Sequence, residues 1–297
     1  MTIDPAKLLE MVALTIPNDL HRNMLVVGSL AAAYYHRSRL GQQAVNTKDA
    51  DVIVHPAGAV DECAQIAKRL LAEGWRRTEQ CFPQKSPFPV ASLRAIRLHP
   101  PQSEAFFIEL LGLPTPGETD AQTWVPCKLD DGWYGMPCFR FMTLLGHERH
   151  NTTFGIQHAS PALMALANLL SHPALGTARM SAEFEGKKIL RSAKDLGRVL
   201  ALAWLEPQDL LETWQETWTR ALLTSFSGEA PALAERVGAG LNELLGSQLA
   251  LREAHVTTNI GLLGGLGVTT AQLEIQGRRL MQDVIEPFAA RLVSANF

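Results

Sequence analysis

The sequence predicts an α+β protein in which a mixed sheet with flanking helices is followed by an all-α helical bundle domain. Three observations lead to this prediction. Before about residue 158, short apolar runs rich in β-branched and aromatic residues alternate with turns. After it, Leu and Ala recur at three- and four-residue spacing, as in helical bundles. The length of 297 residues suits two domains, which we place at 1–158 and 159–297.

Apolar runs and their boundaries define the elements of the first domain. A short amphipathic helix is predicted near 5–15. Met24–Gly28 is a buried strand ending in glycine, and Ser29–Arg39 is a helix with Ser29 as its N-cap. Further predictions are a strand at Asp51–His55, a helix at Val60–Glu73, strands at Ser92–Leu98 and Ala105–Leu111, and loops with one or two short strands over 113–135.

The second domain is expected to consist of helices alone. They are predicted near 161–171, 183–204, 207–225, 230–254 and 270–294. Three tryptophans, Trp204, Trp214 and Trp218, lie on these helices, and packing in the core or between domains is their expected role.

Composition excludes several classes of protein. The net charge is −3 and neither half has a basic excess, so there is no large electrostatic footprint for nucleic acid. The N-terminal segment has no uninterrupted apolar run of the kind a secretory signal needs, and the glycine-rich stretch 256–273 is unsuited to a membrane span. The cysteines are expected to be free thiols in a reducing cytoplasm: Cys63, Cys81, Cys127 and Cys138.

The residues that suggest chemistry lie between Val26 and His55. Gly28 has no Cβ and lets a ligand approach the backbone, while Ser29 offers a hydroxyl beside the unpaired N–H groups that open a helix, as a phosphate site requires. Asp49 and Asp51 are two apart on an extended segment, so both carboxylates leave one face and can bind Mg²⁺. The alternatives are an ordinary strand–helix turn with a serine cap and a solvated turn.

A third carboxylate would complete a metal site, and Glu109 is the candidate. It lies in an otherwise apolar strand, where burying a carboxylate without a partner is costly. A metal shared with Asp49 and Asp51 would resolve that cost. The alternative is an ion pair with Arg94 or Arg97 on a neighbouring strand.

This ordered set of residues resembles the nucleotidyltransferase superfamily, whose fold is shared by DNA polymerase β. The family pattern is Gly-Gly or Gly-Ser at a strand end, then Asp-x-Asp, then a later acidic residue on a strand; Thr47-Lys48 also fits it. The resemblance implies a nucleotidyltransferase-type mixed sheet. It also implies that Gly28 and Ser29 hold nucleotide phosphates, that Asp49, Asp51 and Glu109 are catalytic and bind metal, and that Glu109 is the base.

Within the superfamily the chain looks most like the AbiEii-type group, which includes toxins of toxin–antitoxin pairs. Arg191, Lys194, Asp195 and Leu196 match a basic segment of that group, so the resemblance implies that the first three bind nucleotide. The chain departs from the group where a helix usually carries Lys, because Asn168 stands there. Lys187 or Lys188 would then replace that lysine, or its role is absent. The alternative for the segment is a solvated helix face with internal ion pairs.

Together these expectations describe a cytoplasmic Mg²⁺- or Mn²⁺-dependent enzyme. It would move a nucleoside monophosphate from an NTP, its substrate, to a hydroxyl acceptor and release pyrophosphate. The acceptor would be a tRNA, a protein or a small molecule, and the toxin-like interpretation adds an antitoxin protein as partner. No membrane association is expected. The alternative is a non-catalytic nucleotide-binding or partner-binding protein on the same fold.

Overall fold

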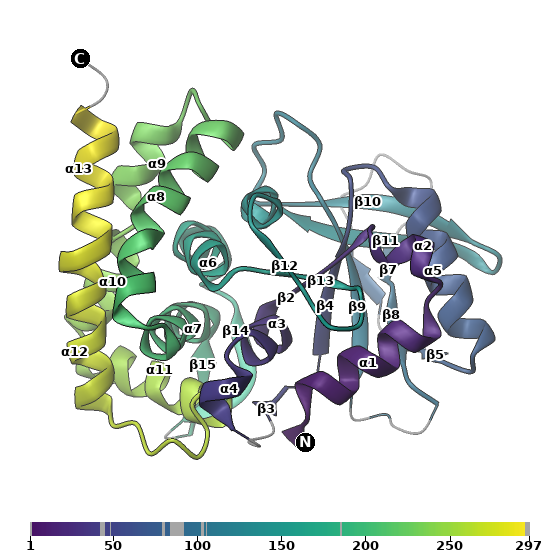
Figure 1. Ribbon diagram of the computed structural model, residues 1–297, viewed down its shortest axis with the longest axis horizontal. Helices are drawn as coiled ribbons and strands as arrows, with labels where there is room; N and C mark the ends of the chain where they lie inside the picture. The colour runs from purple at the N-terminus through teal and green to yellow at the C-terminus, as the bar shows by residue number, and fades with distance from the viewer. Residues whose placement is uncertain are drawn as a thin grey trace. The chain divides into compact units, whose positions relative to one another are not determined.

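The computed structural model describes residues 2–41, 45–47, 49–78, 81–83, 92–101, 104, 106–184 and 186–294. It divides into two compact units (Figure 1). The first comprises Met1–Tyr34 and Ala44–Ala159, and the second comprises Tyr35–Gln43 and Ser160–Phe297. The sequence placed the domain boundary after residue 158, and the structure divides the chain after Ala159. The short segment Tyr35–Gln43, which the sequence assigned to the first domain, groups with the second unit.

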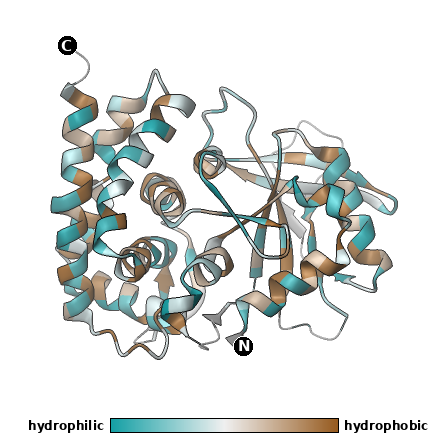
Figure 2. Cartoon of the chain, viewed as in Figure 1, coloured by the Kyte–Doolittle hydropathy of each residue, from teal (hydrophilic) through white to brown (hydrophobic). Residues whose placement is uncertain are grey.

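A seven-stranded sheet, in the order β12-β13-β2-β4-β9-β8-β5, forms the centre of the first unit. Its middle strands are β2 (Met24–Val27), β4 (Asp49–Val54) and β9 (Phe107–Gly112). β4 runs antiparallel to β2 and parallel to β9, so the sheet is mixed and the predicted α+β class is confirmed at that level. All four side chains of β2 are buried, as expected for a central strand covered on both faces. Figure 2 shows these middle strands mostly in the brown of hydrophobic residues, with teal stretches where polar residues stand.

The other strands and helices of this unit frame the sheet. The sheet is completed by β5 (Arg76–Arg77), β8 (Arg97–His99), β12 (Arg149–Asn151) and β13 (Gln157–Ala159). A four-stranded sheet joins β10 (Gln122–Leu129), β11 (Gly132–Phe139), β7 (Ser92–Ala95) and β6 (Cys81–Pro83). The remaining elements are β1 (Thr2–Ile3), α1 (Pro5–Thr15), α2 (Asn18–His21), α3 (Gly28–Tyr35), β3 (Val45–Asn46), α5 (Val60–Ala72) and the 3-10 helix Arg140–Gly146.

Three sequence predictions for this unit are wrong in detail. The strand expected at Ser92–Leu98 is broken at Ile96 into β7 and β8, which belong to different sheets. The region expected to hold loops and short strands, 113–135, contains most of the long hairpin β10–β11. The helix expected at Ser29–Arg39 begins at Gly28 and is interrupted at His36, with α4 (Arg37–Leu40) following. Ser29 is therefore the second helical residue and not the N-cap.

Local capping explains where several helices begin. Asp4 caps α1, because its Oδ1 accepts hydrogen bonds from the backbone N–H groups of Ala6 and Lys7 at 3.0 and 3.3 Å. Ser160 caps the first long helix of the second unit through the N–H of Leu163. Each of these caps is followed by a proline in the first helical turn, where its missing N–H is not needed.

The second unit is a bundle of helices with one small hairpin. Its elements are α4, α6 (Pro161–Leu175), β14 (Arg179–Phe184), β15 (Lys187–Leu190), α7 (Arg191–Leu205), α8 (Gln208–Ser225), α9 (Ala230–Arg236), α10 (Ala239–Leu245), α11 (Gln248–Ile260), α12 (Thr270–Leu280), the π-helical turn Met281–Ile285 and α13 (Glu286–Ser294). Figure 1 shows α12 and α13 as one continuous column. The expected all-α domain is corrected by the hairpin, which replaces the start of the helix predicted over 183–204. The helix predicted over 230–254 is divided among α9, α10 and α11.

Two of the three tryptophans that the sequence assigned to packing, Trp214 and Trp218, are buried in the core of the second unit, whereas Trp204 is half-buried. Trp218 is fully buried and donates a hydrogen bond from its indole N–H to the carbonyl of Ala162 at 2.7 Å. Its ring meets Phe288 edge to face and lies 5.8 Å from the ring of Trp214. Across the residues that the structure describes, no helix is long and apolar enough to cross a membrane.

Candidate functional site

The candidate site is built around the point where β2 ends and α3 begins. No loop separates the two elements, so the first N–H groups of α3 open at the end of a central strand. Gly28 makes this turn with φ of 72°, a conformation that favours glycine. A Cβ on Gly28 would lie only 2.9 Å from Oδ2 of Asp51. Glycine is therefore required here both by the backbone and by a neighbouring carboxylate.

Both aspartates of the predicted pair lie on one face of β4. Asp49 and Asp51 are half-buried, and the residue between them is buried, as the two-residue period of a strand requires. Asp51 pairs with Val27 at the end of β2, which places it beside the turn at Gly28. The hydroxyl of Thr47 lies 3.0 Å from Oδ1 of Asp49 and orients that carboxylate. Lys48 lies outside the described residues.

Glu109 lies on β9, the strand next to β4, at the same level as Asp51. It pairs in register with Asp51 on one side and with Arg97 of β8 on the other. Arg97 donates from Nε to Oε1 at 3.0 Å and from Nη2 to Oε2 at 3.2 Å, and both side chains are largely buried. The ion pair that the sequence left as an alternative is thus present, with Arg97 as the partner. Arg94, the other residue considered, is an exposed residue of β7 in the four-stranded sheet.

Sequence reasoning missed the aromatic residue that completes this face. Phe107 pairs in register with Asp49, and the guanidinium of Arg97 lies over its ring at 5.0 Å from the centroid. The two-residue spacing between Phe107 and Glu109 was the available signal, because residues two apart on a strand share a face.

The residues that fit a divalent cation are the two aspartates. Their carboxylate oxygens are the ligands that Mg²⁺ prefers, and the absent side chain of Gly28 leaves room beside Asp51. Among the described residues, no group of three or more His, Cys, Asp or Glu side chains is arranged to hold a metal. Glu109 as a third ligand, or as the base, stays a prediction.

The residues predicted on the later helix belong to the second unit. Arg191 and Asp195 form an i,i+4 ion pair on α7 with Nε 3.4 Å from Oδ2. Lys194 is half-buried on the same helix. Asn168, which stands where the resembled group has Lys, donates to the carbonyl of Met164 one turn earlier in α6. The internal ion pair left open by the sequence is present, and the role of this segment in binding nucleotide stays a prediction.

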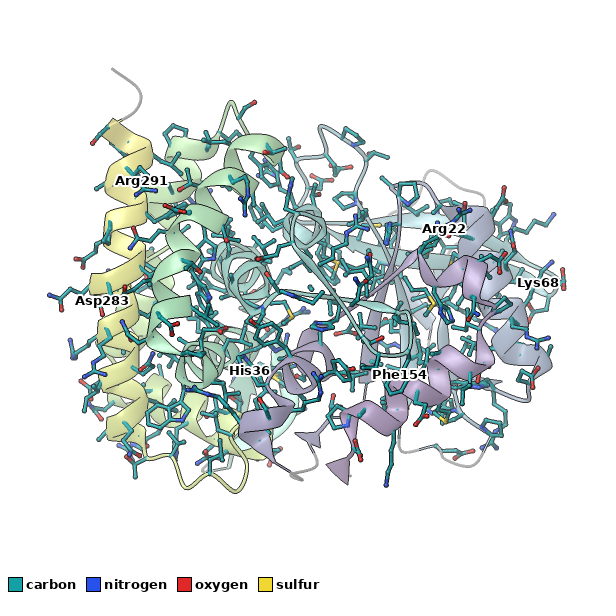
Figure 3. The ribbon with its side chains drawn as sticks, in the orientation of Figure 1. Arg22, His36, Lys68, Phe154, Asp283 and Arg291 are labelled. Carbon is teal, nitrogen blue, oxygen red and sulfur yellow. The ribbon has the colours of Figure 1, made fainter. Side chains whose placement is uncertain are left out.

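Buried histidines lie in both units. Burial, with a further effect from Arg149, lowers the pKa of His55 to about 4; Arg149 donates to Nε2 of this ring at 3.1 Å. Burial and then Arg39 lower the pKa of His36 to about 4. Figure 3 labels His36, which lies between α3 and α4 and whose Nε2 is 4.0 Å from a carboxylate oxygen of Glu206. The Glu206 carboxylate favours the protonated form of the His36 ring. At this distance its effect on the pKa is smaller than that of burial, which favours the neutral ring.

Comparison of the chain with protein-family models found no match, and comparison with curated proteins and with solved structures found no significant one. The functional argument therefore rests on the geometry of the residues themselves.

Proposed function

We propose that the protein is a divalent-cation-dependent nucleotidyltransferase, with Mg²⁺ or Mn²⁺ as the cation. It would transfer a nucleoside monophosphate from an NTP to a hydroxyl group. In this reaction the acceptor oxygen forms a bond to the α-phosphorus, the bond from that phosphorus to the bridging oxygen breaks, and pyrophosphate leaves. The observation that carries the proposal is the contact between the turn at Gly28 and the carboxylate of Asp51, which joins a helix N-terminus to an acidic pair.

The position of each residue of the candidate site suggests its role in the reaction. The N–H groups at the start of α3 and the hydroxyl of Ser29 would bind phosphate oxygens of the NTP. Asp49 and Asp51 would hold the cation, which neutralises triphosphate charge when bound. Asp49 is kept in place by Thr47, and Asp51 by its register between β2 and β9. A carboxylate of this face would accept the proton of the attacking hydroxyl.

The partners follow from the reaction. An NTP is the donor, and the acceptor is a tRNA, a protein or a small molecule with a free hydroxyl. Because the chain resembles the AbiEii-type group, an antitoxin protein is proposed as a further partner. Growth arrest upon expression, relieved by Asp51→Asn, would support that part of the proposal, whereas harmless expression of the active enzyme would count against it.

Pyrophosphate release from each of the four NTPs, with Mg²⁺ and a panel of hydroxyl acceptors, tests the activity. The Asp49→Asn/Asp51→Asn variant should reduce release by at least about a hundredfold, since the groups that bind the cation are gone. Asp130→Asn is the matched control, because Asp130 is exposed and pairs with Lys68 at 2.8 Å on the surface. Equal release by the wild type and the double variant would overturn the proposal.

A second function, nucleotide or partner binding without turnover, is favoured by two observations. Glu109 is held by Arg97, and Asn168 replaces the lysine of the resembled group. Binding of an NTP by the full-length protein, with no pyrophosphate release for any acceptor, would favour this function over transfer.

A further inference from the structure

Two buried thiols face each other where α5 packs on β10. Cys63 lies on α5 and Cys127 on β10, and neither side chain is exposed to solvent. The S–H of Cys127 donates a hydrogen bond to the carbonyl oxygen of Val60 at 3.8 Å, and the S–H of Cys63 donates one to the sulfur of Cys127. The tertiary fold therefore joins two cysteines that are more than sixty residues apart in sequence.

The packing of α5 on β10 holds the two sulfurs in contact. Val60 is the first residue of α5 and Cys63 lies one turn later, so both partners of Cys127 come from the start of the helix. Farther along α5, Nζ of Lys68, which Figure 3 labels, pairs with Oδ1 of Asp130 at 2.8 Å. Asp130 follows β10 in the turn of the hairpin. The helix is therefore attached to the hairpin at two points, one of which is the thiol pair.

The hydrogen bond between the two thiols makes them chemically different. Because Cys127 accepts this bond, its thiolate is stabilised and its pKa is lowered, although burial and the charge of Asp61 act in the opposite direction. The same bond, together with burial, raises the pKa of the Cys63 thiol well above its ordinary value. The thiolate is the nucleophile in cysteine chemistry. Cys127 is therefore the reactive thiol of the pair, and Cys63 is placed to resolve its oxidised form.

The position of β10 gives a small oxidant access to the pair. In the four-stranded sheet that the structure describes, β10 is an edge strand with β11 as its strand neighbour. An edge strand is held by hydrogen bonds on one side, so it opens locally at a lower cost in free energy than a central strand does. Local separation of α5 from β10 exposes both sulfurs, and hydrogen peroxide is small enough to enter such an opening.

We propose that Cys63 and Cys127 form a redox modification site whose oxidant is a peroxide. The pair is a dithiol under reducing conditions and a disulfide after exposure to peroxide. The disulfide connects the first turn of α5 to β10 and stabilises the first unit, because a cross-link between distant residues restricts the unfolded chain. This inference does not depend on the proposed function, which uses neither cysteine.

The reaction has two steps, in which one peroxide molecule accepts two electrons. The thiolate of Cys127 attacks one oxygen of hydrogen peroxide and the O–O bond breaks. The departing hydroxide takes up the proton that Cys127 released, which leaves water and a sulfenic acid. The sulfur of Cys63 then attacks the sulfur of Cys127, the S–O bond breaks, and the hydroxyl group leaves as water with the proton of Cys63. Two thiols and one peroxide thus give one disulfide and two water molecules.

Mass spectrometry of the full-length protein after exposure to hydrogen peroxide tests the proposal without any variant. Reductant is removed, the folded protein is treated with peroxide, and the remaining thiols are alkylated after denaturation. The expected product lacks two hydrogen atoms, keeps two alkylatable cysteines of the four, and yields a peptide cross-linked between Cys63 and Cys127. Dithiothreitol should restore all four thiols. The oxidised protein should have a Tm about 5 °C higher than the reduced protein.

Three variants test the roles of the two thiols. Cys63→Ala should stop the reaction at a sulfenic acid on Cys127, which dimedone traps. Cys127→Ala should leave Cys63 unoxidised at the same peroxide concentration, because burial raises the pKa of the Cys63 thiol. Cys138→Ala is the matched control, since Cys138 is also buried but directs its S–H to the carbonyl of Met136 on its own strand at 3.5 Å. It should form the disulfide at the wild-type rate.

Four outcomes would overturn the proposal. The first is a folded protein whose cysteines all stay reduced at peroxide concentrations that oxidise a cysteine-containing peptide. The second is a disulfide that involves Cys81 or Cys138 in place of the proposed pair, and the third is a cross-link that forms only after the protein has been denatured. The fourth is a disulfide that lowers Tm, because the native packing would then hold the sulfurs apart. If Cys63→Ala does not fold, the cross-link found in the wild type still decides.

Discussion

Two clusters of charged residues in the described part of the molecule differ in origin. The first cluster lies on one face of the sheet, at the start of β4 and β9, and its residues come from β4, β8 and β9. It lies next to the turn between β2 and α3, so residues as far apart in sequence as 28 and 109 are brought together. The face of α7 collects Arg191 and Asp195 from consecutive turns of one helix. The helical pair follows from local spacing, as in many surface helices. The sheet cluster depends on the tertiary fold, and an arrangement of that kind favours a functional explanation.

The largest expected effect is on the free energy of unfolding at low pH, and it concerns one buried histidine in each unit. His36 and His55 have pKa values lowered to about 4, mainly by burial, against 6.5 when unfolded. The unfolded chain therefore binds more protons between pH 6.5 and 4, and stability is complete above pH 6.5 and falls with pH through this window. Each histidine should reduce the free energy of unfolding by about 2 kcal/mol between pH 7 and pH 5.

Denaturant unfolding at pH 7 and pH 5 measures this decrease in the free energy of unfolding, and hydrogen exchange reports it for each unit separately. His55→Gln should reduce the pH dependence in the first unit, and His36→Gln in the second. His147→Gln, at an exposed bend, is the control and should retain the full dependence. A first unit whose stability does not change between these pH values would contradict the assignment of a neutral buried His55.

The next prediction compares the stability effects of replacing two glycines of the first unit that both have positive φ. Gly28→Ala should destabilise the protein by about 2 kcal/mol, because it combines backbone strain with a Cβ 2.9 Å from Asp51. Gly58→Ala should lose about 1 kcal/mol, because Gly58 has φ of 80° but nothing within 4 Å of the added atom. Thermal unfolding measures both variants. Equal losses would show that the carboxylate of Asp51 is not fixed against the turn.

The smallest effect concerns the helical pair. Arg191→Ala should destabilise the protein by about 0.5 kcal/mol, because the Arg191 side chain is 40% exposed and solvent screens the pair. Denaturant unfolding gives this value, and the affinity for the NTP identified as donor should be measured alongside it. A tenfold loss of NTP affinity with this small loss of stability would show that Arg191 contributes to NTP binding. The helical pair could then no longer be explained by local spacing alone.

The candidate site could be predicted where its signals are local. The strand–glycine–helix turn and the two-residue spacing of Asp49 and Asp51 are readable from 26–55 alone. The sequence did not decide the partner of Glu109, because Arg94 and Arg97 both lie in the single strand expected over Ser92–Leu98. The break at Ile96, which sends the two arginines to different sheets, depends on long-range pairing.

The helical unit shows the same limit. The hairpin β14–β15 turns at Gly186 with φ of 75°, a glycine signal that the strong helical periodicity on its C-terminal side obscured. The division of 230–254 is set by packing as well as by glycines. A Cβ on Gly240 would collide with Nε2 of the buried His172, so α10 lies directly against α6. Periodicity identifies a helical region, but contacts of this kind determine where one helix ends and the next begins.

The most direct test of the central claim is thermal unfolding of the full-length protein with each of the four NTPs, with and without Mg²⁺. A ligand at one hundred times its Kd adds about 2.7 kcal/mol of stability. Our account predicts a Mg²⁺-dependent rise in Tm with at least one NTP, abolished by Asp49→Asn/Asp51→Asn and retained by the surface variant Asp130→Asn. No rise with any NTP, or an equal rise in the double variant, would contradict the claim that Gly28, Asp49 and Asp51 form a cation–triphosphate site.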